Sequence, residues 1–418
     1  MSNAIELPTT LAYARGGYSV AVELGGQRQR ANLVLDSGSS TLAVLPTAYD
    51  PQRDTARAAT SLAQQVSYGI GAWAGPVLRT ALAFGSGRHA RRIDDAEVAL
   101  IQSDQQVFYD ADGIFGLAYA GLDTAHDCGA LLQARGVQPP LTWPWPFATG
   151  SDADFADFRT VLRQQPAVTL TPCFSALEQE GVLRDLFALQ IGRAIVHVTD
   201  DASTLAQRAA DPLNQGLLVL GGGEHCQHLY EGPLHSVRIV HDLYYNANLI
   251  GIEVGGQPRL AAAPLAEEDI ARSASNAIFD TGSSFLVLPP DLYAAVLDDF
   301  AAHDPQLPAL IAAFTTAFQS GQGLPNAQVE QHRWPDLHIV VEGAGGGEVR
   351  LTCTPAHYWQ RNALYAGQSL FLLMPQVAGW PAQSILGLPL LAGRYCVFDR
   401  RARGNGVLRL ARARTPHG

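Results

Sequence analysis

Two short acidic turns, far apart in the chain, hold the residues best suited to chemistry. Each turn begins with an aspartate, Asp36 in the first and Asp280 in the second, and continues with Ser or Thr, then Gly, Ser and Ser. When Asp36 is placed on Asp280, six of fourteen positions are identical between residues 33–46 and 277–290. The chain therefore contains an internal repeat with a very long period.

Each aspartate follows a short apolar run, which predicts a buried strand that ends at the carboxylate. An ionised carboxylate in such a place is costly unless nearby groups stabilise it. The turn supplies hydroxyl and backbone N–H donors, and its glycine lets the backbone turn sharply. These supporting residues are Ser37, Gly38 and Ser39 in the first turn, and Thr281, Gly282 and Ser283 in the second.

Two such turns on related halves of a fold would bring two carboxylates together. Like charges a few ångströms apart cannot both ionise, so the pair shares one proton and offers one acid and one base. Such a pair can activate a water molecule. We therefore interpret Asp36 and Asp280 as the catalytic residues.

The paired turns resemble those of the pepsin-like aspartic proteases, and further landmarks of that family follow in order along most of the chain. The likeness is to bacterial members that lack signal, pro-segment and disulfides. It implies a mainly β, bilobal fold, with two pseudo-twofold-related β lobes around a central cleft and a few short helices. Residues 1–235 would form the first lobe, and residues 236–418 the second, whose last strands close the interlobe sheet.

The resemblance also assigns roles within and around the turns. Ser39 and Ser283 would each hydrogen-bond a carboxylate, while Ser37 and Thr281 would lock the turns to one another. Two elements of two hydrophobic residues and a glycine, which end at Gly116 and Gly387, would lie beneath the turns, with the glycine permitting close backbone approach.

Residues 66–75 form a Gly-punctuated hairpin that resembles the flap of this family, about 64–78. Tyr68 falls on the flap tyrosine, and Gly69, Ile70 and Trp73 complete the expected flap and substrate-binding set. Taken alone, a Gly-rich hairpin is simply a turn. The family commonly places a tryptophan seven residues after the first aspartate, where this chain has Ala43. We expect Trp73 to take over some packing, the flap to be looser, and Tyr68→Phe to change turnover little.

Residues from about 121 to 170 are an extra insertion that the resemblance does not cover. A helix capped by Ser151 is predicted there, with Phe155, Phe158, Val161 and Leu162 on one face. The insertion is interpreted either as a surface elaboration of the first lobe or as a rim lid that limits substrate size.

Composition narrows the function classes. The 418 residues favour two lobes, and 47% hydrophobic with 16% charged residues describes an ordinary globular protein. No apolar run approaches the roughly 18 residues that span a bilayer. The net charge of −11 argues against nucleic acid or an anionic membrane as a partner.

The N-terminal residues and the cysteines indicate where the protein is located. Met1 to Leu11 does not resemble a secretory signal, and only 17 residues precede Tyr18, so we expect activity without proteolytic maturation. Five widely spaced cysteines favour thiols in a reducing compartment. A cytoplasmic, bacterial enzyme is predicted, with a secreted or periplasmic one as the alternative if a signal was removed.

The predicted function is aspartic-type endopeptidase activity on extended peptide or protein substrates, cut between hydrophobic residues. An acidic pH optimum, pepstatin sensitivity and a monomer are expected, with no cofactor. His225 and His228 are weak metal-ligand candidates, and no metal is predicted. The glycine run 343–347 lacks a phosphate-loop lysine and is interpreted as a hairpin turn. The alternative function is a catalytically silent pepsin-like protein-binding or inhibitor scaffold; no Gly-x-Ser-x-Gly elbow supports Ser/His chemistry.

Overall fold

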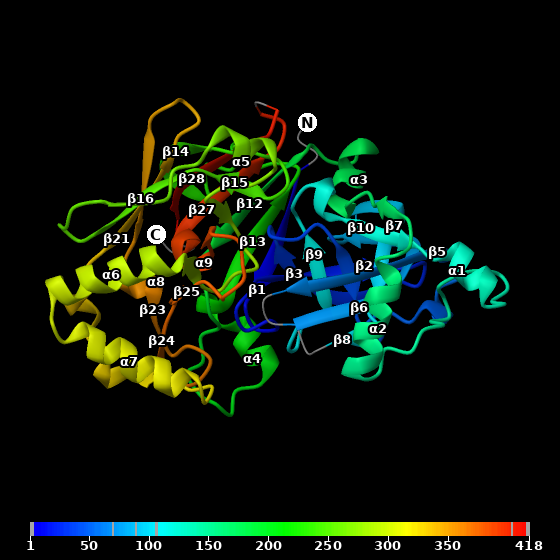
Figure 1. Cartoon of the computed structure of the whole chain (residues 1–418), viewed down its shortest axis with the longest axis horizontal. Helices are drawn as coiled ribbons and strands as arrows, with labels where there is room; N and C mark the ends of the chain where they lie inside the picture. The colour runs from blue at the N-terminus through cyan, green and yellow to red at the C-terminus, as the bar shows by residue number, and fades with distance from the viewer. Residues whose placement is uncertain (1–3, 69–70, 88–89, 105–107, 403, 415–418) are drawn as a thin grey trace. The chain divides into compact units, whose positions relative to one another are not determined.

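A computed structural model describes the chain over residues 4–68, 71–87, 90–104, 108–402 and 404–414. The chain divides into two compact units, the first made of Met1–Leu7 and Ser19–Asp185, and the second of Pro8–Tyr18 and Leu186–Gly418. Strand β1 (Ile5–Thr10) contributes residues to both units. Both units are mainly β with a few short helices, so the predicted fold class is confirmed (Figure 1).

Six strands of the first unit close into a ring, because β6 pairs with β2 as well as with β5 and β7. In spatial order the ring is β2 (Ser19–Leu24), β3 (Gln29–Asp36), β9 (Gly113–Gly116), β4 (Leu42–Val44), β7 (Arg91–Leu100) and β6 (Gly71–Phe84). Strand β2 shows how the sequence specifies the ring: Val20, Val22 and Leu24 alternate with more exposed residues and are almost fully buried. The predicted hairpin of β2 and β3 is confirmed.

Outside the ring, β5 (Ala58–Tyr68) pairs with β6 to form a long hairpin, and the insertion adds strands to the free edge of β5. The insertion contains β10 (Thr124–Asp127), α1 (Gly129–Ala134), α2 (Asp152–Leu162) and β11 (Ala167–Thr169). Helix α2 begins where predicted, since the Ser151 hydroxyl accepts the Asp154 N–H at 3.1 Å. Helix α3 (Cys173–Gln179) ends this part of the chain.

The longest sheet of the second unit is antiparallel. Its first strands come before residue 236, where the sequence analysis began the second lobe. Its order is β13 (Gln215–Leu220), β12 (Leu186–Ile191), β27 (Arg394–Asp399), β28 (Val407–Ala413) and β14 (Tyr230–Arg238). Strand β12 pairs with β27 over six residues, which ties it to the second unit. Residues 186–235 therefore belong with the second unit, not with the first as placed from the sequence.

Three smaller sheets complete the second unit. The first has the order β15 (Tyr245–Ala247), β18 (Ala277–Phe279), β26 (Ser384–Leu386), β19 (Leu286–Leu288) and β25 (Leu373–Pro375). The second has the order β17 (Leu260–Ala261), β16 (Leu249–Val254), β21 (Leu337–Glu342) and β22 (Glu348–Cys353). The third has the order β20 (Leu324–Pro325), β24 (Gln368–Phe371) and β23 (Trp359–Arg361). The predicted glycine-run turn joins β21 to β22.

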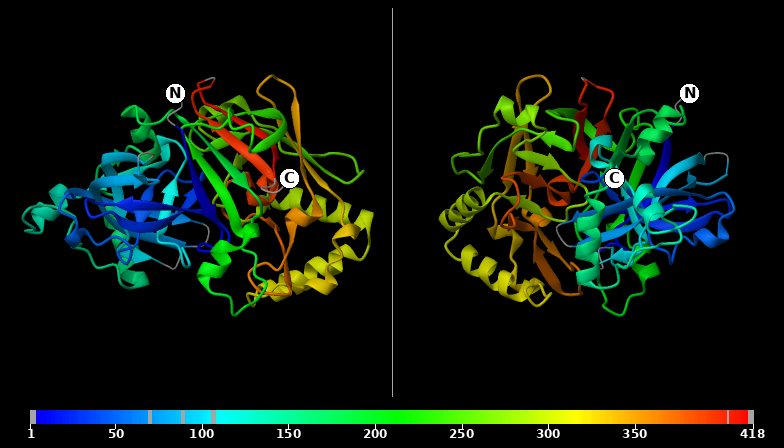
Figure 2. Two further views of the ribbon diagram at one scale, coloured as in Figure 1. Left: turned by 180° about the vertical axis from the view of Figure 1, so that it is seen from behind. Right: turned by 45° about the vertical axis from the view of Figure 1, so that its right-hand side comes forward.

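Two consecutive helices, α6 (Pro290–His303) and α7 (Leu307–Phe318), follow β19 and are the yellow pair in Figures 1 and 2. Phe300 from α6 and Phe314 from α7 are buried against the ring of Phe371. Among the described residues, no helix has both the length and the apolar character that crossing a bilayer requires.

Candidate active site

The first acidic turn sits at the end of a parallel strand pair. Asp36 is the last residue of β3 and lies in register with Gly116 of β9, while β4, which follows the turn, runs antiparallel to β9. The strand β9 thus lies between the strands that enter and leave the turn. A Cβ atom on Gly116 would lie 2.5 Å from Thr41 N and 2.6 Å from Ser39 O, so only glycine fits beneath the loop.

The second turn repeats this arrangement within its own unit. Phe279, which precedes Asp280, lies in register with Leu386 of the parallel strand β26, and β19 runs antiparallel to β26. A Cβ atom on Gly387 would lie 2.3 Å from Phe285 O and 2.5 Å from Ser283 O. The internal repeat of the sequence is therefore a repeat of strand order, direction and glycine contact.

Each of the two carboxylates accepts a hydrogen bond from the backbone N–H of the glycine two residues further along the chain. The Gly38 N–H donates to Asp36 Oδ1 at 2.7 Å, and the Gly282 N–H donates to Asp280 Oδ1 at 2.8 Å. Each bond closes a tight turn in which the aspartate side chain caps the backbone two residues on. Asp36 is 7% exposed, so this donor supports a carboxylate in a largely buried position.

The hydroxyls of Ser39 and Ser283 contact the backbone of their own turns. Ser39 Oγ accepts the Thr41 N–H at 3.4 Å. Ser283 Oγ donates to Phe285 O at 3.0 Å, so its proton is directed to the loop backbone rather than to the Asp280 carboxylate. Ser37 and Thr281 are both buried. Ser39 is also hydrogen-bonded to Tyr68. Ser39 and Ser283 thus stabilise the backbone of their turns, and the glycine N–H groups donate to the carboxylates.

The hairpin of β5 and β6 carries the flap residues, of which Gly69 and Ile70 lie outside the described residues. The Trp73 indole N–H donates to the Tyr68 hydroxyl at 3.3 Å. Trp73 therefore supplies the hydrogen bond as well as the packing that was expected of it, and the absence of an indole at Ala43 no longer argues for a looser flap. Burial raises the pKa of Tyr68 well above its ordinary value, and the nearby Asp36 raises it further.

Behind the first turn lies a buried carboxylate that the sequence analysis missed. Asp123 Oδ1 accepts hydrogen bonds from Thr41 Oγ1 at 3.1 Å and from Gln64 Nε2 at 2.8 Å. Thr41 belongs to the Asp36 loop and Gln64 to β5, so Asp123 joins that loop to the hairpin. Burial raises the pKa of Asp123 to about 6, against the opposing hydrogen bonds from Gln64 and Thr41. No motif surrounds Asp123, and nothing in the sequence marks it.

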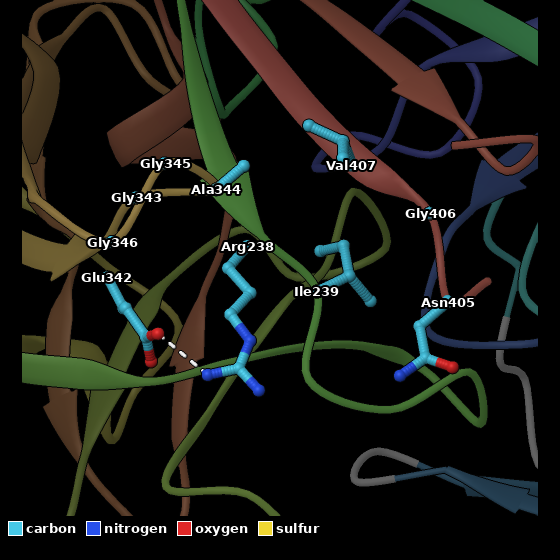
Figure 3. A pocket seen from close by; sticks show the side chains of 10 residues that line it. All are labelled: Arg238, Ile239, Glu342, Gly343, Ala344, Gly345, Gly346, Asn405, Gly406 and Val407. Carbon is cyan, nitrogen blue, oxygen red and sulfur yellow. Dashed lines mark hydrogen bonds and ion pairs between the residues drawn. The ribbon is translucent and has the colours of Figure 1, made fainter. Parts of the chain in front are cut away.

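A hollow of about 440 Å³ opens elsewhere in the second unit, lined by residues 238–239, 342–346 and 405–407 (Figure 3). Its cation, Arg238, is bound to Glu342 at 2.7 Å. None of its lining residues belongs to an acidic turn. Because the charges are matched within the hollow, it offers no net charge to a ligand.

The cysteines and histidines give no metal centre among the described residues, where no three potential ligands gather. All five cysteines are buried, and no disulfide joins any two of them.

Comparison with known proteins gives two findings. A family model described as eukaryotic aspartyl protease matches residues 204–411, which include the second turn. A beta-secretase of Strongylocentrotus purpuratus is 22% identical over 416 residues, and the match covers 94% of this chain. The chain spans 66% of the length of that beta-secretase, slightly less than two thirds. By these sequence similarities and the repeated turn, the chain is similar to the pepsin-like aspartic proteases.

Proposed function

We propose that the chain is an aspartic endopeptidase in which Asp36 and Asp280 act as one catalytic pair. The observation that carries the proposal is the identical framework around the two residues. Each aspartate ends the same strand arrangement above a glycine, and each carboxylate accepts an N–H from the glycine two residues on, at 2.7 and 2.8 Å. A turn that merely ends a strand has no need of this repeated carboxylate support.

In the proposed reaction the two carboxylates hold one proton and one water molecule between them. The ionised carboxylate accepts a proton from the water as its oxygen attacks the peptide carbonyl carbon, and the protonated carboxylate donates to the carbonyl oxygen. The tetrahedral intermediate then collapses: the carboxyl group that took the proton of the water gives it to the departing amine nitrogen, and a hydroxyl proton of the intermediate returns to the other carboxylate, so the pair again holds one proton. The pair titrates jointly, so the shared proton belongs to both residues.

We propose an extended peptide or protein as the substrate, with hydrophobic side chains on either side of the cleaved bond, and pepstatin as an inhibitor. The hairpin that carries Tyr68 and Trp73 would close over the peptide and exclude water. An acidic optimum follows from the need for one proton on the pair. A monomeric, cytoplasmic enzyme stays our prediction from the sequence.

Hydrolysis of a peptide library between about pH 3 and pH 6 tests the proposal. Asp36→Asn and Asp280→Asn should each lower kcat by about a thousandfold or more, because each removes one half of the acid-base pair. Asp157→Asn in α2 and Asp298→Asn in α6 make the same change at exposed positions and should leave kcat unaltered.

Pepstatin should abolish the wild-type activity and bind more weakly to both turn variants. Peptide binding without hydrolysis at any pH, unchanged in both variants, would show the alternative, a catalytically silent binding scaffold. The two outcomes are separated by measuring affinity and turnover on the same peptides.

A further inference from the structure

The pairing of β5 and β6 sorts the hairpin's side chains onto two faces. Cross-strand partners in an antiparallel pair lie on the same face. Gln64, Val66 and Tyr68 therefore share a face with Trp73, here named the loop face because Gln64 bonds to Thr41 of the Asp36 loop. The opposite face carries Ala63, Ala72 and Ala74, and we name it the insertion face.

The insertion covers the alanines of the insertion face. Ala63, Ala72 and Ala74 form one buried cluster with Cys128 and Leu132 near and in α1, and with Phe155, Phe158 and Leu162 of α2. The two helices are the blue-green elements beside β5 and β6 in Figure 1. Trp145, Phe147 and Phe158 close the cluster as an aromatic triad, with ring centroids 5.0 to 5.2 Å apart. Small side chains on the hairpin let these large ones approach its backbone closely.

The insertion also binds the hairpin through its backbone. The Thr142 hydroxyl, which is fully buried, donates to Leu62 O at 2.7 Å, and the Thr142 N–H donates to Thr60 O at 2.9 Å. These carbonyls lie at an irregularity of the β5–β6 pairing, between Ala59 and Ala63. The side chain and backbone of Thr142 thus satisfy carbonyl groups at an interrupted ladder.

A second backbone attachment comes from β10, which extends the hairpin sheet. His126 and Asp127 lie in register with Ala63 and Leu62 of β5. The Cys128 N–H donates to Ser61 O at 2.9 Å. The same stretch of β5, residues 60–63, is therefore held by two separate parts of the insertion.

The insertion reaches the loop face as well, through its first residues. Asp123 accepts from both Gln64 and Thr41, and its own N–H and carbonyl are fixed by Ala120 O and the Leu170 N–H. Gln64 is 1% exposed and follows Ala63, which lies in the alanine cluster. One inserted segment thus contacts the hairpin on both faces at neighbouring residues.

We propose that the insertion 121–170 is a brace for the hairpin, which holds β5 at residues 60–64 and so sets the hinge and the extent of flap opening. Because Ala72 and Ala74 of β6 are also covered by the insertion, only the part of the hairpin beyond Ser67 and Ala72 would then move when a substrate enters. Thr142 is the positioning residue where the brace holds β5. The catalytic consequence rests on the proposed protease function. The mechanical part does not, because the contacts that carry it all lie within the first unit.

Thr142→Val tests the brace, since it removes the buried hydroxyl and keeps the side-chain shape. Thr160→Val is the matched control: its hydroxyl donates to Ala156 O on the exposed side of α2, in the same insertion. Hydrogen exchange is measured by mass spectrometry on the whole chain, with peptides from 58–68 and 71–84 compared with β21 and β22 as an internal reference. In Thr142→Val the amide hydrogens of the hairpin peptides should exchange about tenfold faster than in the wild type, and those of the reference peptides should exchange at the wild-type rate. In Thr160→Val both sets of peptides should exchange at the wild-type rate.

Phe158→Leu provides a second variant, because it loosens the aromatic triad without removing a hydrogen bond. It should raise hairpin exchange in the same peptides. Equal exchange in the wild type, Thr142→Val and Phe158→Leu would overturn the brace, as would an increase that is equally large in β21 and β22. If hairpin exchange rises in a protein whose Asp36→Asn variant proves as active as the wild type, the brace stands and the protease proposal fails.

Discussion

The indole nitrogen of Trp73 lies 3.3 Å from the hydroxyl oxygen of Tyr68, on the same face of one hairpin. Tyr68 pairs directly with Gly71, so Trp73 is its diagonal neighbour across the two strands. The bond is internal to the hairpin and moves with it. It orders the tyrosine ring. The hairpin is joined to the Asp36 loop by a hydrogen bond between Tyr68 and Ser39, and by the contacts of Gln64 and Asp123 with Thr41.

If Tyr68 belongs to the proposed flap, Trp73→Phe should lower kcat/KM by about three- to tenfold, the cost of the single hydrogen bond that orders its ring. Trp73 is fully buried, so the smaller ring leaves a cavity, and the free energy of unfolding should fall by about 1 kcal/mol or more. Trp334→Phe is the matched control, because the Trp334 indole nitrogen is buried with no hydrogen-bond partner among the described residues. Unaltered kcat/KM in Trp73→Phe would show that Tyr68 needs no indole donor, as the sequence alone suggested.

The glycines beneath the turns give a second prediction. Gly116→Ala and Gly387→Ala each place a Cβ atom within 2.5 Å of loop backbone, so the loop or the strand must shift. Each variant should lose about 1–3 kcal/mol of unfolding free energy and about a hundredfold in kcat, since displaced carboxylates no longer meet the substrate correctly.

The control for the glycine variants is the same change in open space. Gly150→Ala and Gly345→Ala have no atom within 4 Å of the new Cβ, so both should keep wild-type kcat and stability. Urea unfolding and peptide hydrolysis on the four variants check this. Wild-type kcat in Gly387→Ala would contradict the role of Asp280 as strongly as any aspartate substitution.

The sequence revealed the site where a short motif carries the geometry, and not where tertiary contacts do. The two acidic turns predicted a strand before each aspartate, and the family resemblance placed the strands that end at Gly116 and Gly387 beneath the turns. The hydrogen bond from the Trp73 indole to Tyr68 could not be predicted, because a diagonal contact across a hairpin depends on the register of the two strands and not on sequence spacing alone. Asp123 gave no signal, since a single buried aspartate acquires its partners only when Thr41 and Gln64 are folded around it.

The position of the lobe boundary also depends on tertiary contacts that the sequence does not show. The pairing of β12 with β27 joins residues about two hundred positions apart, and no local pattern announces such a partner. Residues 186–235 were therefore placed with the wrong unit. The role of the insertion was equally hidden, because alanines at 63, 72 and 74 look unremarkable until aromatic rings cover them.

Asp123 makes a prediction about pH. Its folded pKa is raised from 3.8 to about 6, chiefly by burial, with a further contribution from Glu97. Between pH values of about 4 and 6 the folded state binds the proton more tightly than the unfolded state, so the unfolding free energy falls over this range and levels off above it. The loss amounts to at most about 3 kcal/mol. Asp123→Asn keeps an oxygen acceptor for Thr41 and Gln64 and removes this loss.

Urea unfolding of the wild type and Asp123→Asn at a series of pH values measures the difference. The variant should gain stability relative to the wild type as the pH rises from about 4 to about 6, the difference should then level off, and the two should converge near pH 4. Tyr68 and Cys173 also face Asp123, but both pKa values are raised further above this window. A constant difference from pH 4 to pH 7 would show that Asp123 does not titrate in this range.

The last prediction concerns resistance of the second unit to acid, in which the proposed enzyme would work. Asp399 is 4% exposed and binds Arg401 through both carboxylate oxygens, at 2.8 and 3.0 Å, and Arg409 at 2.8 Å. Burial opposes its ionisation, but the bonds to the two arginines outweigh burial and lower the pKa to about 2. Because the folded pKa lies below the unfolded one, this stabilisation is complete above about pH 4 and is lost as the pH falls through 2.

Asp399→Asn should lower the free energy of unfolding by at least about 2 kcal/mol at pH 7 and at pH 4, with the difference shrinking at pH 2. Asp269→Asn removes an exposed ion pair to Arg272 and should cost less than about 0.5 kcal/mol at every pH. An equal, small effect of both substitutions at pH 4 would mean that the buried carboxylate does not hold the β27–β28 hairpin together in acid.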